Sequence, residues 1–139
     1  MARRNLVIYG RGNAGKTTII NKLYNRLQNT DPNIVIYRER KQLGKIEDND
    51  FSAIIIYKGR SIVLYSAGDY INSIDEAISI GCNYDILVCA CHRKFHGLYK
   101  SKFNRNIEKK QYRKDISAKN EKLTEEIVNI IEEVIQEIS

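Results

Sequence analysis

Residues 10–17 read Gly-Arg-Gly-Asn-Ala-Gly-Lys-Thr and combine three glycines with a lysine and a threonine in the order G-x-x-x-x-G-K-T. Gly12 and Gly15 carry no Cβ, so the backbone can turn successive N–H groups toward one point, where a phosphate would be held. Lys16 supplies a mobile cation for the terminal phosphates, and the hydroxyl of Thr17 is a suitable ligand for Mg²⁺. The spacing therefore predicts a cradle for a phosphate chain and its magnesium ion.

The segments on either side of this loop predict a strand before it and a helix after it. Residues 5–9 form a short apolar run, and apolar residues recur at helical spacing after Lys16. In this context residues 10–17 resemble the Walker A loop of the P-loop NTPase superfamily. The alternative is a glycine turn that only begins a helix, which would require neither the lysine nor the threonine. The resemblance implies nucleotide binding by Gly10, Arg11, Gly12, Asn13, Ala14, Gly15, Lys16, Thr17 and Thr18.

The apolar pattern of the remaining chain predicts an α/β fold. Strands are predicted at residues 34–37, 51–57, 61–65 and 84–91, and helices at residues 71–78 and 123–138. Residues 5–37 would form a right-handed parallel βαβ unit with two buried strands, followed by a polar surface loop. The two strands around Lys58-Gly59-Arg60 predict a hairpin. With the resemblance, these elements imply a three-layer P-loop NTPase fold, mostly parallel with one antiparallel hairpin strand, in a single domain of residues 1–139.

A second acidic residue for the magnesium site is predicted directly after the 61–65 strand. The sequence continues as Ser-Ala-Gly-Asp at residues 66–69, which puts Asp69 at the end of a strand, where ligands bind in such folds. We expect Asp69 to hold Mg²⁺ together with Thr17. The alternative role of Asp69 is the N-cap of the following helix. The segment is similar to the D-T-A-G turn of small GTPases, but Tyr65 stands where those proteins have aspartate.

Arg93 and Lys94 follow the 84–91 strand at the same predicted end of the sheet as the glycine loop. Either cation is a candidate to stabilise charge as the terminal phosphoryl group moves, and a solvated basic loop is the alternative. Glu39 is a candidate base for water or an acceptor hydroxyl, although a surface loop would also hold it. The predicted catalytic residues are Lys16, Asp69 and Arg93.

The 84–91 strand ends in Cys-Ala-Cys. The hairpin, the Ser-Ala-Gly-Asp turn and this strand together resemble small, poorly characterised bacterial P-loop proteins, in which an arginine follows the second cysteine. His92 stands there in this chain. Cys89 and Cys91, with His92 and His96, lack the paired spacing of a structural zinc site. We therefore expect both cysteines to pack under a helix as small apolar residues.

Positive charge is concentrated in one segment. The chain carries a formal charge of +6, and residues 93–114 hold nine Lys or Arg against one Glu, a net of +8. This basic segment is predicted to be a loop with a short edge strand near residues 107–112, and it would suit a nucleic acid or an acidic protein partner. Its aromatic residues would be available to stack on bases: His96, Tyr99, Phe103 and Tyr112.

Composition excludes several classes and leaves three functions open. No apolar run approaches the roughly 20 residues of a membrane span, and three cysteines in no framework spacing favour the cytoplasm.

The leading hypothesis is Mg²⁺-dependent binding and slow hydrolysis of a nucleoside triphosphate. ATP is favoured over GTP because the sequence lacks the N-K-x-D guanine signature. The alternatives are a kinase that transfers the γ-phosphate to a small molecule or nucleotide, and a non-enzymatic nucleotide-gated module that binds nucleic acid or a protein.

Overall fold

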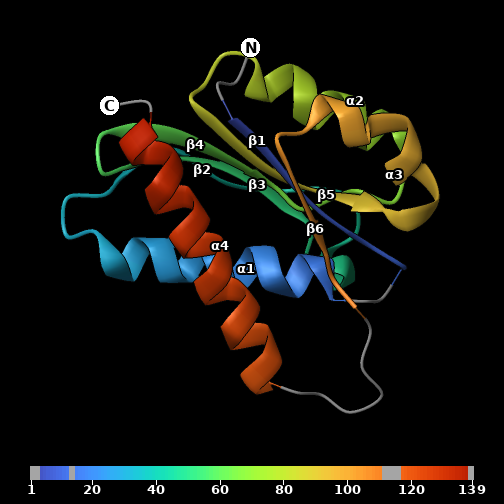
Figure 1. Cartoon of the computed structure of the whole chain (residues 1–139), viewed down its shortest axis with the longest axis horizontal. Helices are drawn as coiled ribbons and strands as arrows, with labels where there is room; N and C mark the ends of the chain where they lie inside the picture. The colour runs from blue at the N-terminus through green and yellow to red at the C-terminus, as the bar shows by residue number, and fades with distance from the viewer. Residues whose placement is uncertain (1–3, 13–14, 111–116, 138–139) are drawn as a thin grey trace.

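The computed structural model describes residues 4–12, 15–110 and 117–137, and these residues form an α/β fold around a six-stranded sheet (Figure 1). The strand order is β2-β3-β4-β5-β1-β6. Neighbouring strands pair in parallel from β4 to β6, whereas β3 runs antiparallel to both β2 and β4. The predicted sheet, mostly parallel with one reversed hairpin strand, is therefore confirmed. The strands are β1 (Arg4–Gly10), β2 (Val35–Gln42), β3 (Phe51–Tyr57), β4 (Arg60–Tyr65), β5 (Ile86–His92) and β6 (Arg105–Glu108).

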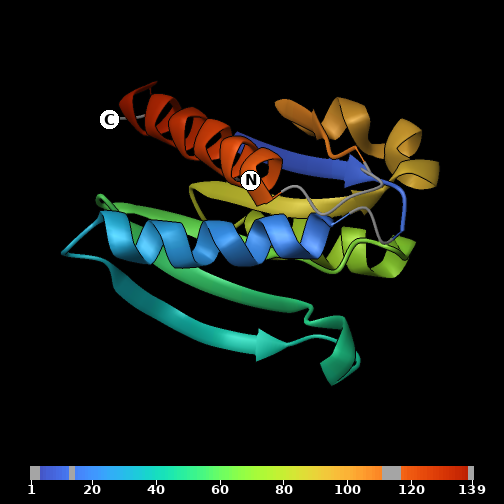
Figure 2. The same cartoon turned by 90° about the horizontal axis from the view of Figure 1, so that it is seen from below.

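Helices cover both faces of the sheet, which gives three layers. Helices α1 and α4 lie together on one face, as Figure 2 shows from below, and α2 and α3 cover the other. No helix in the described part of the chain is both long enough and apolar enough to cross a lipid bilayer. The helical elements are α1 (Lys16–Thr30), α2 (Ile71–Gly81), α3 (Arg93–Tyr99) and α4 (Ser117–Glu137), with short 3₁₀ turns η1 (Ile46–Asp48) and η2 (Lys100–Lys102).

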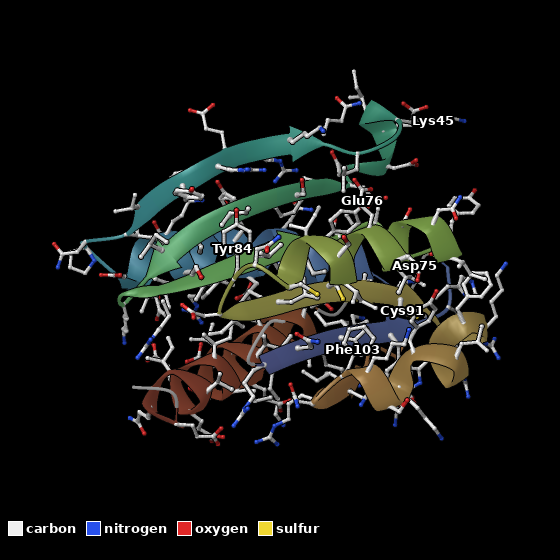
Figure 3. All side chains as sticks on the ribbon, turned by 90° about the horizontal axis from the view of Figure 1, so that it is seen from above. Lys45, Asp75, Glu76, Tyr84, Cys91 and Phe103 are labelled. Atoms are coloured by element: carbon white, nitrogen blue, oxygen red, sulfur yellow. The ribbon has the colours of Figure 1, made fainter. Side chains whose placement is uncertain are left out.

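Alternation along the central strands builds the two cores. In β1, Leu6 and Ile8 point into the core under α1 and α4, and Val7 between them points into the core under α2 and α3. Cys89 and Cys91 of β5 share the second core, as predicted, and Figure 3 shows Cys91 on the strand beneath α2. Because both faces are buried, the central strands are continuous apolar runs in the sequence.

The strand predicted at residues 34–37 is present, but the prediction that it is buried is wrong. Instead of a buried strand, β2 is an edge strand whose residues are all exposed and which pairs with β3 alone. It also extends through Gln42, into residues expected to be a loop. Its apolar start, Val35 to Tyr37, matched the pattern of an interior strand, but the hairpin strands β3 and β4 separate it from the centre of the sheet.

The described part of the basic segment, residues 93–110, contains more regular structure than predicted. It contains α3 and η2, and its edge strand β6 is residues 105–108 rather than 107–112. Tyr99 and Phe103 are buried in the core under α2, so they are not available to stack on bases, and Figure 3 shows Phe103 close to β1. The ring of His96 already stacks on Tyr9, with 3.7 Å between the ring centres. Tyr112 lies outside the described residues.

Gly68 holds the segment after β4 against the end of β5. Its carbonyl accepts a hydrogen bond of 2.7 Å from the backbone N–H of His92. A Cβ at this position would lie 2.2 Å from the carbonyl oxygen of Ala90, which is too close for any side chain. The absence of a side chain at Gly68 therefore sets where Asp69, the next residue, can lie.

We expect Gly68→Ala to lower the free energy of unfolding by at least about 1–3 kcal/mol, because the clash is with backbone that cannot move aside. Urea denaturation followed by circular dichroism measures this. Gly97→Ala in α3 is the matched control: its Cβ would meet nothing within 4 Å, and alanine favours a helix by up to about 1 kcal/mol over glycine. Equal stability of the two variants would contradict the proposed close approach.

Candidate functional site

The candidate site lies at the edge of the sheet where β1, β4 and β5 end. The pairing register sets Gly10 of β1 beside His92 of β5 and Tyr65 of β4 beside Cys89 of β5, so the segments that follow these strands begin close together. Because β3 is reversed, its first residues reach the same edge. Phe51 and Ser66 exchange hydrogen bonds there, with backbone N–H to carbonyl at 2.9 Å and backbone N–H to hydroxyl at 2.8 Å.

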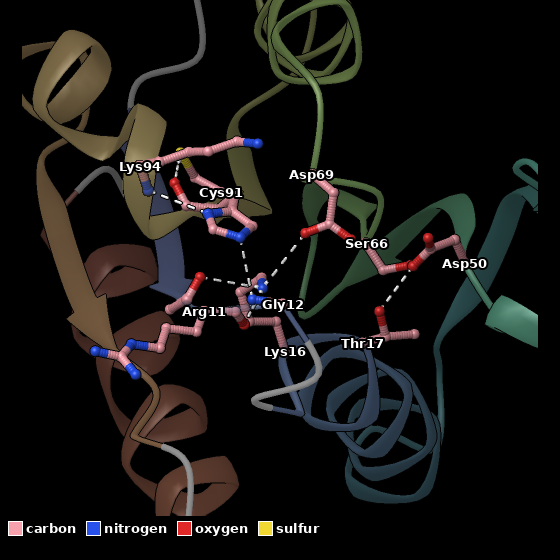
Figure 4. Close-up of polar contacts among 11 residues, drawn as sticks. Arg11, Gly12, Lys16, Thr17, Asp50, Ser66, Asp69, Cys91 and Lys94 are labelled. Atoms are coloured by element: carbon pink, nitrogen blue, oxygen red, sulfur yellow. Dashed lines mark hydrogen bonds and ion pairs between the residues drawn. The ribbon is translucent and has the colours of Figure 1, made fainter.

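Lys16 is the first residue of α1, and its ammonium group is turned back onto the loop that precedes it. Gly15 has a φ of 100°, which favours glycine and lets the chain enter the helix at this angle. The Lys16 Nζ donates to the carbonyl oxygens of Gly10 at 3.2 Å and Arg11 at 2.8 Å, and lies 3.6 Å from Asp69 Oδ1 (Figure 4). Only 6% of the Lys16 side chain is exposed. A buried cation is thus held at the start of a helix beside an acid.

Thr17 contacts an acid that the sequence did not predict. Its hydroxyl donates to Asp50 Oδ1 at 2.7 Å, and the hydroxyl of Ser66 donates to the same oxygen at 3.1 Å (Figure 4). Asp50 comes directly before β3. The predicted hairpin could have indicated its position, because a hairpin places the residue before its first strand, Asp50, beside the residue after its second strand, Ser66. The carboxylate nearest to Thr17 in these contacts is therefore Asp50 rather than Asp69.

The predicted magnesium acid, Asp69, pairs with Lys16 instead of Thr17. Its side chain is 53% exposed and lines the same cleft as both residues. The alternative role as a helix cap is wrong, because the residue before α2 is Tyr70 and no side chain caps this helix. Asp50 and Asp69 thus approach the loop from two sides, one at the threonine and one at the lysine.

A cleft of about 670 Å³ opens beside these residues. One wall is the start of α1 and the other consists of η1 and the first turns of α2. The acidic side chains that line it are Glu47, Asp48, Asp50, Asp69 and Glu76. Lys16 is the cation among its lining residues, so the walls carry a net negative charge, which favours a phosphate chain that arrives with a cation.

Tyr65, at the position where small GTPases have aspartate, donates its hydroxyl to Glu76 Oε2 of α2 at 2.5 Å. Burial, together with this hydrogen bond, raises the pKa of the Tyr65 hydroxyl well above its usual range. The hydroxyl therefore stays protonated at neutral pH and ties α2 to β4. This departure from the GTPase pattern is structural: Tyr65 does not supply a metal ligand of its own.

His92 stands where the small bacterial P-loop proteins that the sequence resembles were expected to have arginine, and it contacts the loop directly. Its Nε2 accepts from the backbone N–H of Gly12 at 3.2 Å, and its Nδ1 lies 3.1 Å from the backbone N of Lys94 (Figure 4). Burial, followed by the nearby Lys16 cation, lowers the pKa of His92 below its ordinary value. The ring is thus neutral at neutral pH and able to accept a hydrogen bond.

Other predicted residues lie apart from this cluster. Arg93 is the exposed first residue of α3 and does not line the cleft, and Thr18 lines the cleft with an exposed side chain. Glu39 is exposed on β2 and lines a separate hollow of about 160 Å³. Arg11 is exposed, and Asn13 and Ala14 lie outside the described residues. The structure therefore brings together Gly12, Gly15, Lys16, Thr17 and Asp69, and the backbone carbonyls of Gly10 and Arg11, with Asp50 and His92.

Comparison of the chain with protein-family models, with curated proteins and with solved structures found no match. Within the described ranges, no three His, Cys, Asp or Glu side chains gather into a group that would hold a metal ion by themselves. A metal at this site would need ligands from a hydroxyl, from water or from a bound phosphate as well.

Proposed function

We propose that this chain is a P-loop NTPase that binds ATP with Mg²⁺ at residues 10–18 and hydrolyses it slowly. The observation that carries the proposal is the position of Lys16: a buried ammonium group at the N-terminus of a 15-residue helix, in the wall of the cleft and beside Thr17. The positive end of a helix and a lysine favour negative charge at one point. ATP remains preferred because the sequence lacks a guanine signature.

The oxygen ligands in the cleft fit Mg²⁺. This ion prefers oxygen and is usually held by one or two carboxylates together with phosphate oxygens and water, so it does not need a preformed group of three acids. The Thr17 hydroxyl and the Asp50 carboxylate, 2.7 Å apart, are the pair that would hold it, with Asp69 facing them across the cleft. When bound, Mg²⁺ would neutralise charge on the phosphate oxygens.

The protein groups would act by positioning and by charge. The Lys16 ammonium would exchange the carbonyls of Gly10 and Arg11 for oxygens of the terminal phosphates. Asp69, now 3.6 Å from this ammonium, would orient it and the attacking water. Arg93 would need to turn toward the cleft to contribute, so we assign it no role in binding.

Replacing Lys16 by alanine is expected to weaken binding of Mg²⁺-ATP about a hundredfold or more, because several charge-assisted contacts are lost together. Titration calorimetry measures this. Lys22→Ala is the matched control, since Lys22 lies on the same helix but pairs with Glu121 of α4. Unchanged affinity in the Lys16 variant would refute the assignment of the loop.

The two acids are expected to differ in their effect on magnesium. Asp50→Asn keeps the size of the side chain and an oxygen for Thr17 but removes the charge, so it should raise the Mg²⁺ concentration needed for half-maximal ATP binding about tenfold or more. Asp69→Asn should change it less. A larger effect of Asp69→Asn than of Asp50→Asn would show that Asp69 is the main magnesium ligand, as the sequence indicated.

The kinase alternative draws support from the cleft, which continues past Lys16 to Glu47 and Glu76 and leaves room for an acceptor. Glu39, the candidate base, does not line it. We expect ATP labelled in its γ-phosphate, incubated with the protein and a panel of nucleosides, nucleotides and small alcohols, to release label as free phosphate, with Lys16→Ala as the inactive control. Label in an acceptor would replace the hydrolase proposal with the kinase.

The non-enzymatic alternative draws support from exposed cations on α3, η2 and β6, namely Arg93, Lys94, Lys100, Lys102 and Arg105. Arg93 and Lys94 follow β5 directly, so this basic segment begins next to the phosphate loop. Contacts with a nucleic acid there would be electrostatic, since Tyr99 and Phe103 are buried. This favours attraction of phosphates over recognition of bases.

A further inference from the structure

His92 ends β5 beside the phosphate loop, and both nitrogens of its ring face backbone amides. Nε2 lies 3.2 Å from the amide nitrogen of Gly12, and Nδ1 lies 3.1 Å from that of Lys94 in the first turn of α3. The sheet fixes this position, because the register pairs His92 with Gly10, two residues before the loop amide. The ring thus contacts a backbone amide of the loop, that of Gly12, which a bound phosphate would need as a hydrogen-bond donor.

A neutral imidazole cannot accept both hydrogen bonds. It carries one proton, on Nδ1 or on Nε2, and only the other nitrogen accepts. With the proton on Nδ1, the ring accepts from Gly12; with the proton on Nε2, it caps α3 at Lys94 and leaves the Gly12 amide to another acceptor. A protonated ring accepts from neither. The partner of the loop amide therefore depends on where the proton of His92 sits.

Charged groups from three elements surround this ring. Lys16 of α1 and Lys94 of α3 disfavour a second proton on it, Asp69 after β4 favours one, and burial adds the largest penalty, so the pKa of His92 is lowered. A polyphosphate on the loop would add several negative charges beside the ring. Binding would thus reverse the balance that keeps His92 neutral in the free protein.

We propose that His92 is a positioning residue of the phosphate loop, which gives up the Gly12 amide and takes one proton from the solvent when a polyphosphate binds. The inference rests on the proposed function. A phosphate oxygen replaces Nε2 as the acceptor of the Gly12 N–H, and the imidazolium becomes a donor and a cation facing the anion. No bond to phosphorus forms or breaks in this step.

Binding is then coupled to pH. Because the complex holds one proton more than the free protein, affinity rises as the pH falls through the range between the two pKa values of His92. A rise of about one unit in this pKa on binding corresponds to an increase of about tenfold in affinity from the high-pH to the low-pH plateau. A histidine that only supported the fold would leave the affinity without this proton linkage.

The experiment is calorimetric titration with Mg²⁺-ATP between about pH 5.5 and pH 8.5, the range in which histidine titrates. Wild type is compared with His92→Gln, which keeps an acceptor but cannot titrate. His96→Gln is the matched control, since His96 lies nearby in α3 but contacts Tyr9 and Asn106 instead of the loop. The wild-type to His92→Gln affinity ratio should change about tenfold across this range, whereas His96→Gln should follow wild type. Taking the ratio removes the protonation of ATP itself.

A second measurement needs only the wild type. The chain has two histidines, so their ring signals can be followed by NMR as the pH changes. The pKa of His92 should rise when Mg²⁺-ATP is added. An unchanged pKa, or a constant affinity ratio, overturns the inference and leaves nucleotide binding intact. Absence of Mg²⁺-ATP binding at every pH overturns the proposed function and the inference with it.

Discussion

Parallel pairing of β1, β4 and β5 determines the candidate site, because it brings the carboxyl ends of three strands to one edge of the sheet. Gly12 and His92 are 80 positions apart in the chain, yet the register of two strands makes them neighbours. The ladder that sets this register is buried on both faces, where its hydrogen bonds do not compete with water. The side chains of the site are therefore positioned by the most rigid part of the molecule, and the loops only complete it.

Patterns that depend on neighbours in the chain predicted most of this framework. The apolar runs of β1 and β5, the β3–β4 hairpin and the amphipathic helices α1, α2 and α4 are local signals, and each element was found, although α4 begins at Ser117, before the predicted residue 123. The place of a strand in the sheet is not a local property. Val35 to Tyr37 have the apolar pattern of an interior strand, but strand order leaves β2 at the edge, exposed along its whole length.

The sequence analysis singled out the acid that follows a parallel strand, Asp69, and missed the acid that precedes a reversed strand, Asp50. Asp69 was singled out because it stands in the segment that follows β4, and it lies in the cleft, although it pairs with Lys16 rather than Thr17. Asp50 comes before β3, and its neighbour Thr17 is 33 positions away. The predicted hairpin implied that β3 is antiparallel to β4, so the position of Asp50 could have been predicted from the sequence. The helix that begins at Arg93 was not, because seven residues with few apolar positions give no periodic signal.

Three polar groups expected to bind a nucleotide already have partners within the protein. The Lys16 ammonium is bound to two loop carbonyls, the Thr17 hydroxyl to Asp50 and the Gly12 amide to His92. Binding of a magnesium–phosphate complex would therefore exchange hydrogen bonds rather than add them, so its net gain is smaller than a count of contacts suggests. The same internal bonds hold the loop in place, which lowers the entropy lost on binding. Of the three exchanges, the one at His92 is distinctive, because imidazole changes from acceptor to donor by taking up a proton, whereas the lysine and the threonine keep their donor roles.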